Sequence, residues 1–197
     1  MNKTVKYTLF MIVLGVIISF ALALVNEITS PIIEQQKLEK VKTSLLEVDN
    51  VNKWEIYSNF INISEDEFIE EVYVSKTGNN EIKYYAYLTI TKGYSNGDIE
   101  SIIFIDNLNK NLYKVKIISI ENQTKGIGSL ILDDPNYVKN FENKKIEDYL
   151  NDEVNNHTSA SSDVISGATI SSRGVIQAVI SAWIIIIKIG DKNETSK

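Results

Sequence analysis

The chain of 197 residues contains no cysteine and a single histidine, His157. The absence of cysteine excludes disulfide bonds, thiolate zinc sites, cysteine-ligated iron–sulfur clusters, c-type haem attachment and a cysteine nucleophile. One histidine cannot build a multi-histidine metal site, and His157 lies in the polar segment NDEVNNHTSASSD, which is expected to be a solvated loop. If this protein transfers electrons, it must therefore do so with an organic cofactor.

Positively charged residues are outnumbered. There are 20 lysines and arginines against 26 aspartates and glutamates, a formal net charge of −6 at pH 7. A surface that follows nucleic-acid phosphates needs an excess of Lys and Arg, so nucleic acid is excluded as a partner. A hydrophobic fraction of 44% and a charged fraction of 23% are typical of a globular protein. The length suits one ordinary domain with an appendage.

The common catalytic and nucleotide-binding loops are also missing. The sequence has no GxxxxGK[ST] phosphate loop, no GxGxxG dinucleotide fingerprint and no GxSxG nucleophile elbow. The pair of glycines in TKGIGS is weak evidence by itself. A nucleotide-hydrolysing enzyme and a serine hydrolase are therefore disfavoured.

An uncharged apolar run, YTLFMIVLGVIISFALALV, occupies residues 7–25. A helix rises about 1.5 Å per residue, so this run is long enough to cross a hydrocarbon core of about 30 Å. Lys3 and Lys6 precede the run and Glu27 follows it, so the positive-inside rule predicts a cytoplasmic N-terminus and an extracytoplasmic remainder. Residues 1–25 are therefore interpreted as a cytoplasmic stub and a single transmembrane anchor in the cell membrane.

A cleaved signal peptide is the alternative interpretation of this run. The tripeptide ALA at residues 21–23 has the small-x-small form of a cleavage site. The apolar run is longer than the roughly 7–15 residues of a signal peptide's apolar region, which favours a retained anchor.

Residues 26–50 are predicted to form a connecting helix. Ser30 is expected to cap that helix, and Pro31 suits the first helical position, where its missing N–H has no intrahelical partner. Residues 51–197 are then assigned to one extracytoplasmic domain.

The first half of that domain has strand patterns. Four segments are rich in Ile, Val, Tyr and Thr with partial alternation, and turn-like residues separate them. Because short connections imply hairpins, the segments are expected to pair antiparallel as a meander or a bent sheet. They are FIEEVYVS (68–75), EIKYYAYLTIT (81–91), DIESIIFID (98–106) and LYKVKIISIE (112–121).

Helical patterns follow the strands. Residues 136–152 have short helical character, and the apolar stretch 174–190 is interrupted by Gln177, Ser181 and Lys188. Because those residues interrupt it, the stretch falls short of the 18 or so uncharged residues of a membrane span and is predicted to be a buried helix of the domain. The predicted fold class is α+β, with an N-terminal transmembrane helix, an antiparallel sheet and flanking helices.

The segment DVISGATISSRGV, residues 163–175, concentrates small and hydroxyl residues before the apolar helix. Gly167 permits a positive φ and close approach of another molecule, and Ala168 adds almost no bulk. A helix that begins near Ser171 would present the Thr169 hydroxyl beside unpaired N–H groups that suit a phosphate, with Arg173 one turn further on. An ordinary cap, with Ser171 or Thr169 as the N-cap residue, is the alternative.

These residues resemble the flavinylation motif D-x-x-[ST]-G-A-T of the FMN-binding domain family, matched by Asp163, Ser166, Gly167, Ala168 and Thr169. The resemblance implies FMN joined to Thr169 through a phosphoester bond, installed by a flavin transferase. It further implies that Ser166, Gly167 and Ala168 shape the phosphate site and that Asp163 is recognised by the transferase. No catalytic residue and no metal site are implied.

Two upstream segments extend the resemblance. In KGYSNGDI the family's GYxGxI pattern is matched by Gly93, Tyr94, Gly97 and Ile99. The segment NQTKGIG falls where the family carries ETPGLG, and Thr124, Gly126 and Gly128 match. Gln123 and Lys125 replace the family's glutamate and proline, which removes one carboxylate and leaves the turn less rigid. The resemblance places Thr124 and Gly126 against the flavin.

The anchor, the single domain and the length are together similar to the RnfG family. Its members are the FMN-carrying components of Rnf-type ferredoxin:NAD oxidoreductase complexes, which couple electron transfer to Na⁺ or H⁺ export. This similarity implies an electron-transfer subunit without a substrate site of its own. Its partners would be the other membrane subunits of a redox-driven ion pump. The related NqrC family of sodium-pumping quinone reductases, another FMN carrier of extracellular electron transfer, and an anchored binding module without flavin remain alternatives.

Overall fold

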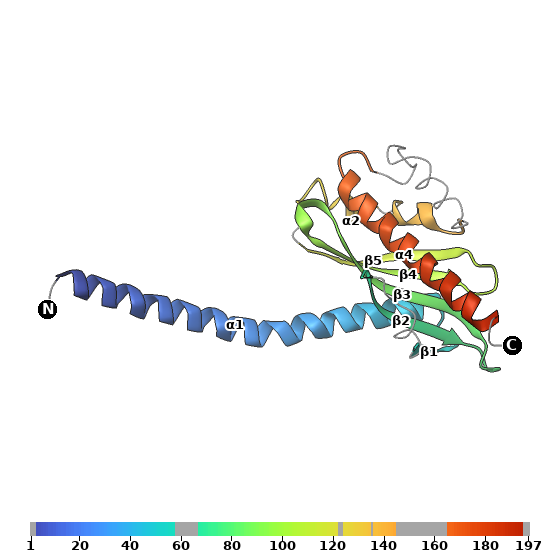
Figure 1. Cartoon of the computed structure of the whole chain (residues 1–197), viewed down its shortest axis with the longest axis horizontal. Helices are drawn as coiled ribbons and strands as arrows, with labels where there is room; N and C mark the ends of the chain where they lie inside the picture. The colour runs from blue at the N-terminus through green and yellow to red at the C-terminus, as the bar shows by residue number, and fades with distance from the viewer. Residues whose placement is uncertain (1–2, 58–66, 122–123, 135, 145–164, 195–197) are drawn as a thin grey trace. The chain divides into compact units, whose positions relative to one another are not determined.

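The computed structural model describes residues 3–57, 67–121, 124–134, 136–144 and 165–194, with side chains to residue 187. The chain divides into two compact units, Met1–Lys42 and Thr43–Lys197. The elements, in order, are α1 (Lys3–Val48), β1 (Lys53–Ile56), β2 (Ile69–Lys76), β3 (Ile82–Lys92), η2 (Tyr94–Asn96), β4 (Asp98–Asp106), β5 (Leu112–Ile120), α2 (Leu130–Asp133), η3 (Val138–Phe141) and α4 (Thr169–Glu194) (Figure 1).

The apolar run 7–25 lies in α1, and every residue from 3 to 25 is exposed. Two helices among the described residues are long and apolar enough to cross a membrane, α1 and the first part of α4. The apolar stretch of α4 that is long enough to cross a membrane is 67% buried inside the protein, whereas the corresponding stretch of α1 is not buried at all. The apolar helix near the N-terminus is thus compatible with a single-pass membrane anchor, and the prediction that the last apolar stretch is a buried helix is confirmed.

The expected helix start at Ser30 is wrong, because α1 continues through Pro31 without a break. The Ser30 hydroxyl donates to Asn26 Oδ1 at 3.3 Å instead of capping a new helix. Proline in a helix interior removes one hydrogen bond and costs about 3 kcal/mol. Thr29 donates to the Val25 carbonyl at 2.8 Å in the same turn. Long helical segments on both sides therefore outweigh one local helix breaker.

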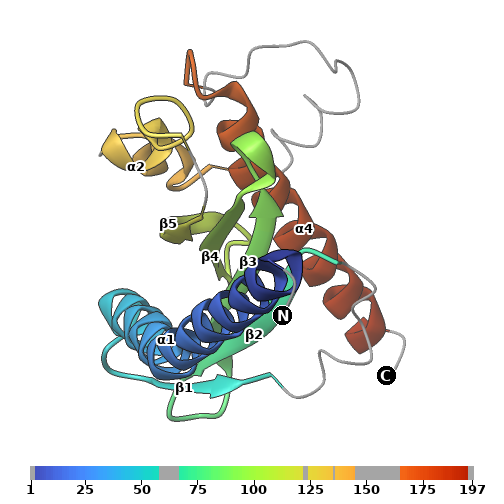
Figure 2. The same ribbon diagram turned by 90° about the vertical axis from the view of Figure 1, so that its left-hand side faces the viewer.

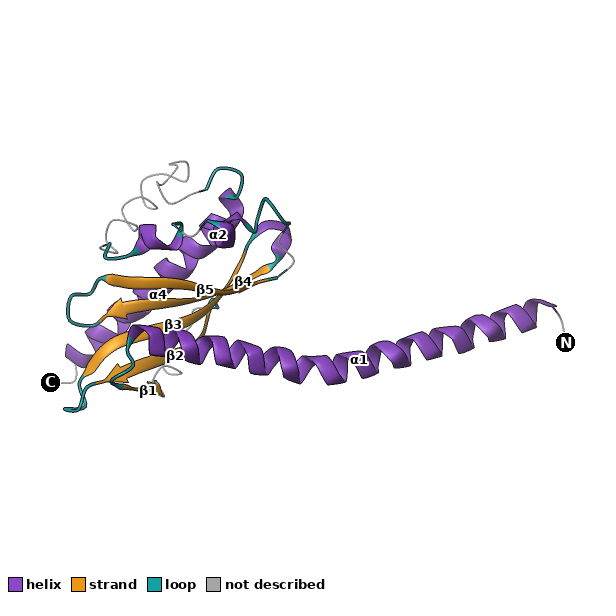
Figure 3. Ribbon diagram, turned by 180° about the vertical axis from the view of Figure 1, so that it is seen from behind, coloured by secondary structure: helices purple, strands orange, loops and turns teal. Residues whose placement is uncertain are grey.

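The antiparallel sheet of the second unit is confirmed, and it has five strands in the order β1-β2-β3-β4-β5 (Figure 3). Each strand pairs with the next along the chain, as a meander requires. The four predicted strands correspond to β2 to β5 within one or two residues. Strand β1, which was not predicted from the sequence, has only four residues and pairs with β2 alone. The predicted α+β fold class is thus confirmed.

Helix α4 packs along one face of this sheet, as Figures 1 and 2 show. Along β3 and β4, every second residue lies on this face. Residues of the two strands that share the face lie opposite one another, such as Tyr87 and Ile103 or Thr91 and Ile99. The packed positions of α4 follow a helical period and are almost fully buried. They are Val175, Ala178, Val179, Ala182, Ile185 and Ile186.

Gly174 of α4 lies directly against the end of β3. A Cβ atom there would lie 2.7 Å from the Lys92 carbonyl oxygen and 3.1 Å from Ile99 Cδ1. Since Lys92 contributes a backbone atom, the contact can be relieved only by moving the helix or the strand. Glycine at this position therefore sets the distance between the start of α4 and the end of β3.

Replacing Gly174 with alanine is expected to lower the free energy of unfolding by about 1–3 kcal/mol, as overpacking does. Helix propensity alone favours alanine over glycine by up to about 1 kcal/mol, so the sign of the effect separates the two causes. Urea denaturation measures it. Gly78→Ala is the control, since a Cβ atom at Gly78 would have no neighbour within 4 Å and should change stability little.

The opposite face of the sheet carries a second set of buried residues that includes Ala86, Leu88, Ile102 and Phe104. Glu47, in the last turn of α1 and in the same compact unit as the sheet, binds Lys116 at 2.7 Å and Lys114 at 3.6 Å. These ion pairs join that turn to β5.

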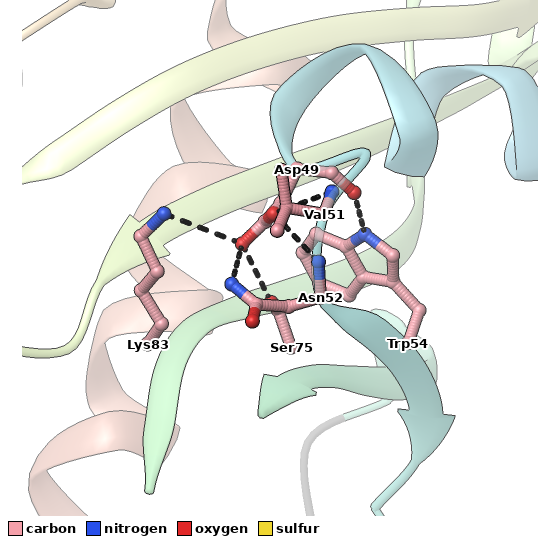
Figure 4. Close-up of polar contacts among 6 residues, drawn as sticks. All are labelled: Asp49, Val51, Asn52, Trp54, Ser75 and Lys83. Atoms are coloured by element: carbon pink, nitrogen blue, oxygen red, sulfur yellow. Dashed lines mark hydrogen bonds and ion pairs between the residues drawn. The ribbon is translucent and has the colours of Figure 1, made fainter. Parts of the chain in front are cut away.

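Asp49, directly after α1, organises the junction with the sheet (Figure 4). Its carboxylate accepts hydrogen bonds from the Ser75 hydroxyl and the Asn52 side chain, each at 2.8 Å, and from the N–H groups of Val51 and Asn52. Lys83 lies 3.4 Å from the same carboxylate. Burial opposes ionisation of Asp49, but these hydrogen bonds to the charged form outweigh it and hold its pKa well below its usual range.

Candidate functional site

The segment SGAT forms a tight turn that leads directly into α4. The Ala168 N–H donates to the Ile165 carbonyl at 3.0 Å, which closes the turn. Gly167 has a φ of +88°, a left-handed conformation that a residue with a Cβ adopts only with strain. Ser166 and Thr169 are both exposed, whereas Ala168 is 2% exposed. The turn therefore buries its alanine and presents two hydroxyl groups to solvent.

The ordinary-cap alternative is wrong, because neither Ser171 nor Thr169 caps this helix. The Ala168 carbonyl accepts the first bond, from the Ser172 N–H at 2.9 Å, so Ala168 occupies the N-cap position and α4 begins at Thr169. Alanine has no side-chain oxygen to cap a helix. The Thr169 and Ile170 N–H groups lie in the first turn, where the helix itself offers no acceptor.

The two serines after Thr169 hold the turn in place. The Ser172 hydroxyl accepts a hydrogen bond from the Ile165 N–H at 3.1 Å, and the Ser171 hydroxyl accepts one from the Tyr94 N–H at 3.3 Å. The Tyr137 hydroxyl donates to the Ser172 carbonyl at 3.3 Å. Both serines are fully buried. They are structural anchors of the site that the sequence analysis did not assign.

The Tyr94 contact joins the GYSNG segment to the start of α4. Residues 93–97 form the turn between β3 and β4, closed by the Gly93 N–H donating to the Gly97 carbonyl at 2.9 Å. Ser95 and Asn96 both have a φ of +57°. The GYSNG segment therefore contacts the first turn of α4, which follows SGAT directly, although the two bonded residues are 77 positions apart in sequence.

The glycine loop TKGIGS is a compact turn before α2. The Thr124 carbonyl accepts from the Ile127 N–H at 3.1 Å, and the Gly126 N–H donates to the Ser129 hydroxyl at 2.9 Å. Gly126 has a φ of +77°, a left-handed backbone conformation that favours glycine because it has no Cβ atom. Thr124 and Gly126 are both exposed. Lys125, at the family's proline position, is also exposed.

Helix α2, which directly follows the glycine loop, approaches the SGAT turn through Leu130. A Cβ atom added to Gly167 would lie 3.8 Å from Leu130 Cδ1, in ordinary van der Waals contact. Ala168, Ile131 and Tyr137 belong to one hydrophobic cluster. The structure thus places Ser166, Gly167, Ala168 and Thr169 at one turn, and it places α2, which directly follows the loop of Thr124 and Gly126, against that turn. Two further expected residues, Asp163 and Gln123, lie outside the described residues.

This turn offers a binding site for an anion next to a hydroxyl group to which a phosphate can be attached. A helix N-terminus carries partial positive charge and directs N–H groups outward, which favours a phosphate. Within the described part of the chain, no group of three or more His, Asp or Glu side chains could hold a metal ion. The arrangement can hold a phosphate group, and the Thr169 hydroxyl can be its point of attachment.

The model of the FMN-binding domain family matches residues 93–183 of this chain. The matched segment starts at the GYSNG turn, contains the glycine loop and the SGAT turn, and ends within α4. Separate comparisons with curated proteins and with solved structures found no match. The family match indicates a flavin-binding electron-transfer protein and supports FMN as its cofactor.

Proposed function

We propose that this chain is a membrane-anchored electron-transfer subunit that carries FMN joined by a phosphoester bond to Thr169. One observation carries the proposal: the exposed Thr169 is the first residue of α4, directly after the turn of the left-handed Gly167, within the segment that matches the FMN-binding domain. FMN supplies a group that accepts and donates one or two electrons, which no side chain of a cysteine-free chain provides.

The residues of the turn fit a phosphate on that hydroxyl. Ala168 caps no N–H group, so the amides of Thr169 and Ile170 are available to phosphate oxygens. Gly167 keeps the approach free of side-chain atoms, and Ser166 adds an exposed hydroxyl next to it. Arg173 follows Thr169 by one helical turn and supplies positive charge near the attachment point.

The neighbouring loops complete the proposed site. Thr124 and Gly126, exposed in the glycine loop, are assigned to contact the flavin beyond its phosphate. Asp163 is assigned to recognition by the flavin transferase that would install FMN. The chain's own contribution is to bind and orient the group, since electron transfer requires no acid or base at this site.

The proposed setting is the cell membrane. The uncharged run 7–25 within α1 would serve as a single-pass anchor, and the basic residues Lys3 and Lys6 would keep the N-terminus in the cytoplasm. The domain would then lie outside the cytoplasm. An anchored flavin stays near the membrane surface, where it can exchange electrons with membrane subunits of an Rnf-type complex coupled to Na⁺ or H⁺ translocation.

Isolation of the full chain from a host that has a flavin transferase tests this proposal. The protein is expected to stay in the membrane fraction at high salt and to be yellow in detergent. The colour should bleach on reduction with dithionite and survive acid precipitation, because a covalent bond is not broken by unfolding. A colourless protein from such a host would contradict the proposal.

Membership of a complex has its own test. Mild detergent extraction of native membranes, followed by affinity isolation of this chain, is expected to recover other membrane-spanning redox subunits. Recovery of the chain by itself under several mild detergents would argue against an Rnf-type assembly, while leaving flavin attachment unaffected.

A further inference from the structure

A surface hollow of about 400 Å³ lies where the first turns of α4 pass over the end of β3. Its volume falls within the range of small-molecule pockets, roughly 300–1,000 Å³. Helix α4 contributes one face of its first turns, and Figure 2 shows α4 running beside β3. The lining residues are Phe68, Thr91, Lys92, Ile170, Arg173, Gly174 and Gln177.

Thr91, one of the residues that line this hollow, carries an unsatisfied polar group. Its side chain is 1% exposed, and its Oγ1 has no hydrogen-bond partner among the described residues. Thr89, two residues earlier on the same face of β3, is also fully buried but bonds to the Ser101 carbonyl at 3.0 Å and to the Ser101 hydroxyl at 2.8 Å. A buried hydroxyl without a partner is costly, so an acceptor or donor from a ligand would relieve that cost.

The charge at the rim of the hollow is positive. The Lys92 ammonium is bound to the Asp98 carboxylate. The exposed guanidinium of Arg173, by contrast, makes no ion pair with any residue that the structure describes. It thus has donors available for an anion, and guanidinium groups bind carboxylates in a two-pronged geometry.

The remaining walls are apolar. Phe68 is held beside β3, since its carbonyl accepts the Ile90 N–H at 2.8 Å. Ile170 is 54% exposed on the α4 side, and Gly174 adds no side chain between them. Apolar walls with a few convergent polar groups are the usual composition of a small-molecule site.

We propose that this hollow binds a small amphipathic anion, specifically an aromatic carboxylate. Its ring lies against Phe68 and Ile170, and its carboxylate pairs with Arg173 and accepts a hydrogen bond from the Thr91 hydroxyl. The site is separate from the Thr169 hydroxyl, which does not line the hollow. In the chain without flavin, the guanidinium of Arg173 is available to pair with this carboxylate.

Calorimetric titration of the unflavinylated full chain with 1-naphthoate tests the proposal. Saturable binding is expected, with weaker binding of the neutral 1-naphthamide and of inorganic phosphate. Equal binding of the amide would show that the charge of Arg173 is not used, and equal binding of phosphate would show that the apolar walls are not used. Either result, or no saturable binding of naphthoate, overturns the proposal. The Thr169→Ala chain should bind naphthoate as the wild type does.

Matched variants on β3 separate binding from folding. Thr91→Val keeps the shape and removes an unpaired hydroxyl, so the Tm should stay the same or rise while naphthoate binding weakens several-fold. Thr89→Val removes a paired hydroxyl, so the Tm should fall by several degrees while binding is unchanged. If both variants bind naphthoate equally well, Thr91 takes no part in a site and the proposal fails.

Arg173→Gln tests the charge directly. Loss of a charge-assisted pair should weaken naphthoate binding about tenfold or more and leave naphthamide binding unchanged. Because the Arg173 side chain is exposed, the Tm of this variant should equal that of the wild type. Undiminished naphthoate binding by a folded Arg173→Gln chain would overturn the proposal.

Discussion

Replacing Thr169 with alanine is expected to abolish the flavin fluorescence that the wild-type chain retains on a denaturing gel. The effect is all or none, because the phosphoester needs the hydroxyl oxygen as its bridge. The substitution removes no cap, since Ala168 holds the N-cap position, and Thr169 is exposed. The variant should therefore fold with wild-type stability and bind no flavin covalently. Both chains are co-expressed with a flavin transferase and compared on the same gel.

Thr169→Ser is the matched control for the attachment site. It keeps a hydroxyl at the first position of α4 and should therefore retain fluorescence on the gel. Persistent fluorescence in Thr169→Ala would locate the flavin elsewhere, with the exposed hydroxyl of Ser166 the nearest candidate.

Asp49→Asn is expected to lower the free energy of unfolding by about 2–4 kcal/mol at pH 7. The carboxylate is buried and accepts four hydrogen bonds from Val51, Asn52 and Ser75. An asparagine offers one acceptor oxygen and turns an N–H₂ group toward the donors of Asn52 and Ser75. The junction between α1 and the sheet therefore loses its central acceptor.

The effect of Asp49 depends on pH in a predictable direction. Its pKa in the folded protein lies below the value of an unfolded aspartate, about 3.9. Its contribution to stability is thus fully present above that pH and is lost as the pH falls toward the folded-state pKa. Urea denaturation from pH 7 down to pH 3 should show a constant stability gap between the two chains down to about pH 4 and a narrowing gap below it. A stability gap that stays constant over this range would contradict the assignment.

Asp106→Asn is the control for Asp49. Asp106 accepts hydrogen bonds from the Leu108 N–H and the Asn109 side chain in the turn between β4 and β5, so it has a similar local geometry. These contacts are exposed, and water can replace them. The variant should lose well under half as much stability as Asp49→Asn.

The sheet could be predicted from sequence because its signal is local. Strands β2 to β5 each carry eight or more residues rich in β-branched and aromatic side chains, with turn residues between them. Strand β1 lacks such a signal, since KWEI forms a strand through its pairing with β2. At Pro31, by contrast, the local signal led to a wrong prediction of a helix start. Its local preference for a helix start was outweighed by the continuous helix on either side.

The site was only partly predictable. Gly167 and Thr169 belong to a short contiguous motif, so a resemblance can find them. Ser171 and Ser172 act through partners 77 and 35 residues away, Tyr94 and Tyr137, and no local pattern encodes those distances. The same holds for the Ala168 cap. Serine and threonine are the preferred caps, yet here alanine holds the N-cap position, and the hydroxyls of the two serines accept hydrogen bonds from the Tyr94 and Ile165 N–H groups instead.

The most direct test of the central claim is the mass of the native chain. Protein isolated from a host with a flavin transferase is predicted to carry the added mass of one FMN less one water. After trypsin, that mass should move with the peptide of residues 146–173 and localise to Thr169 on fragmentation. A native chain with the mass of the polypeptide alone, or with the added mass on another residue, would contradict the account.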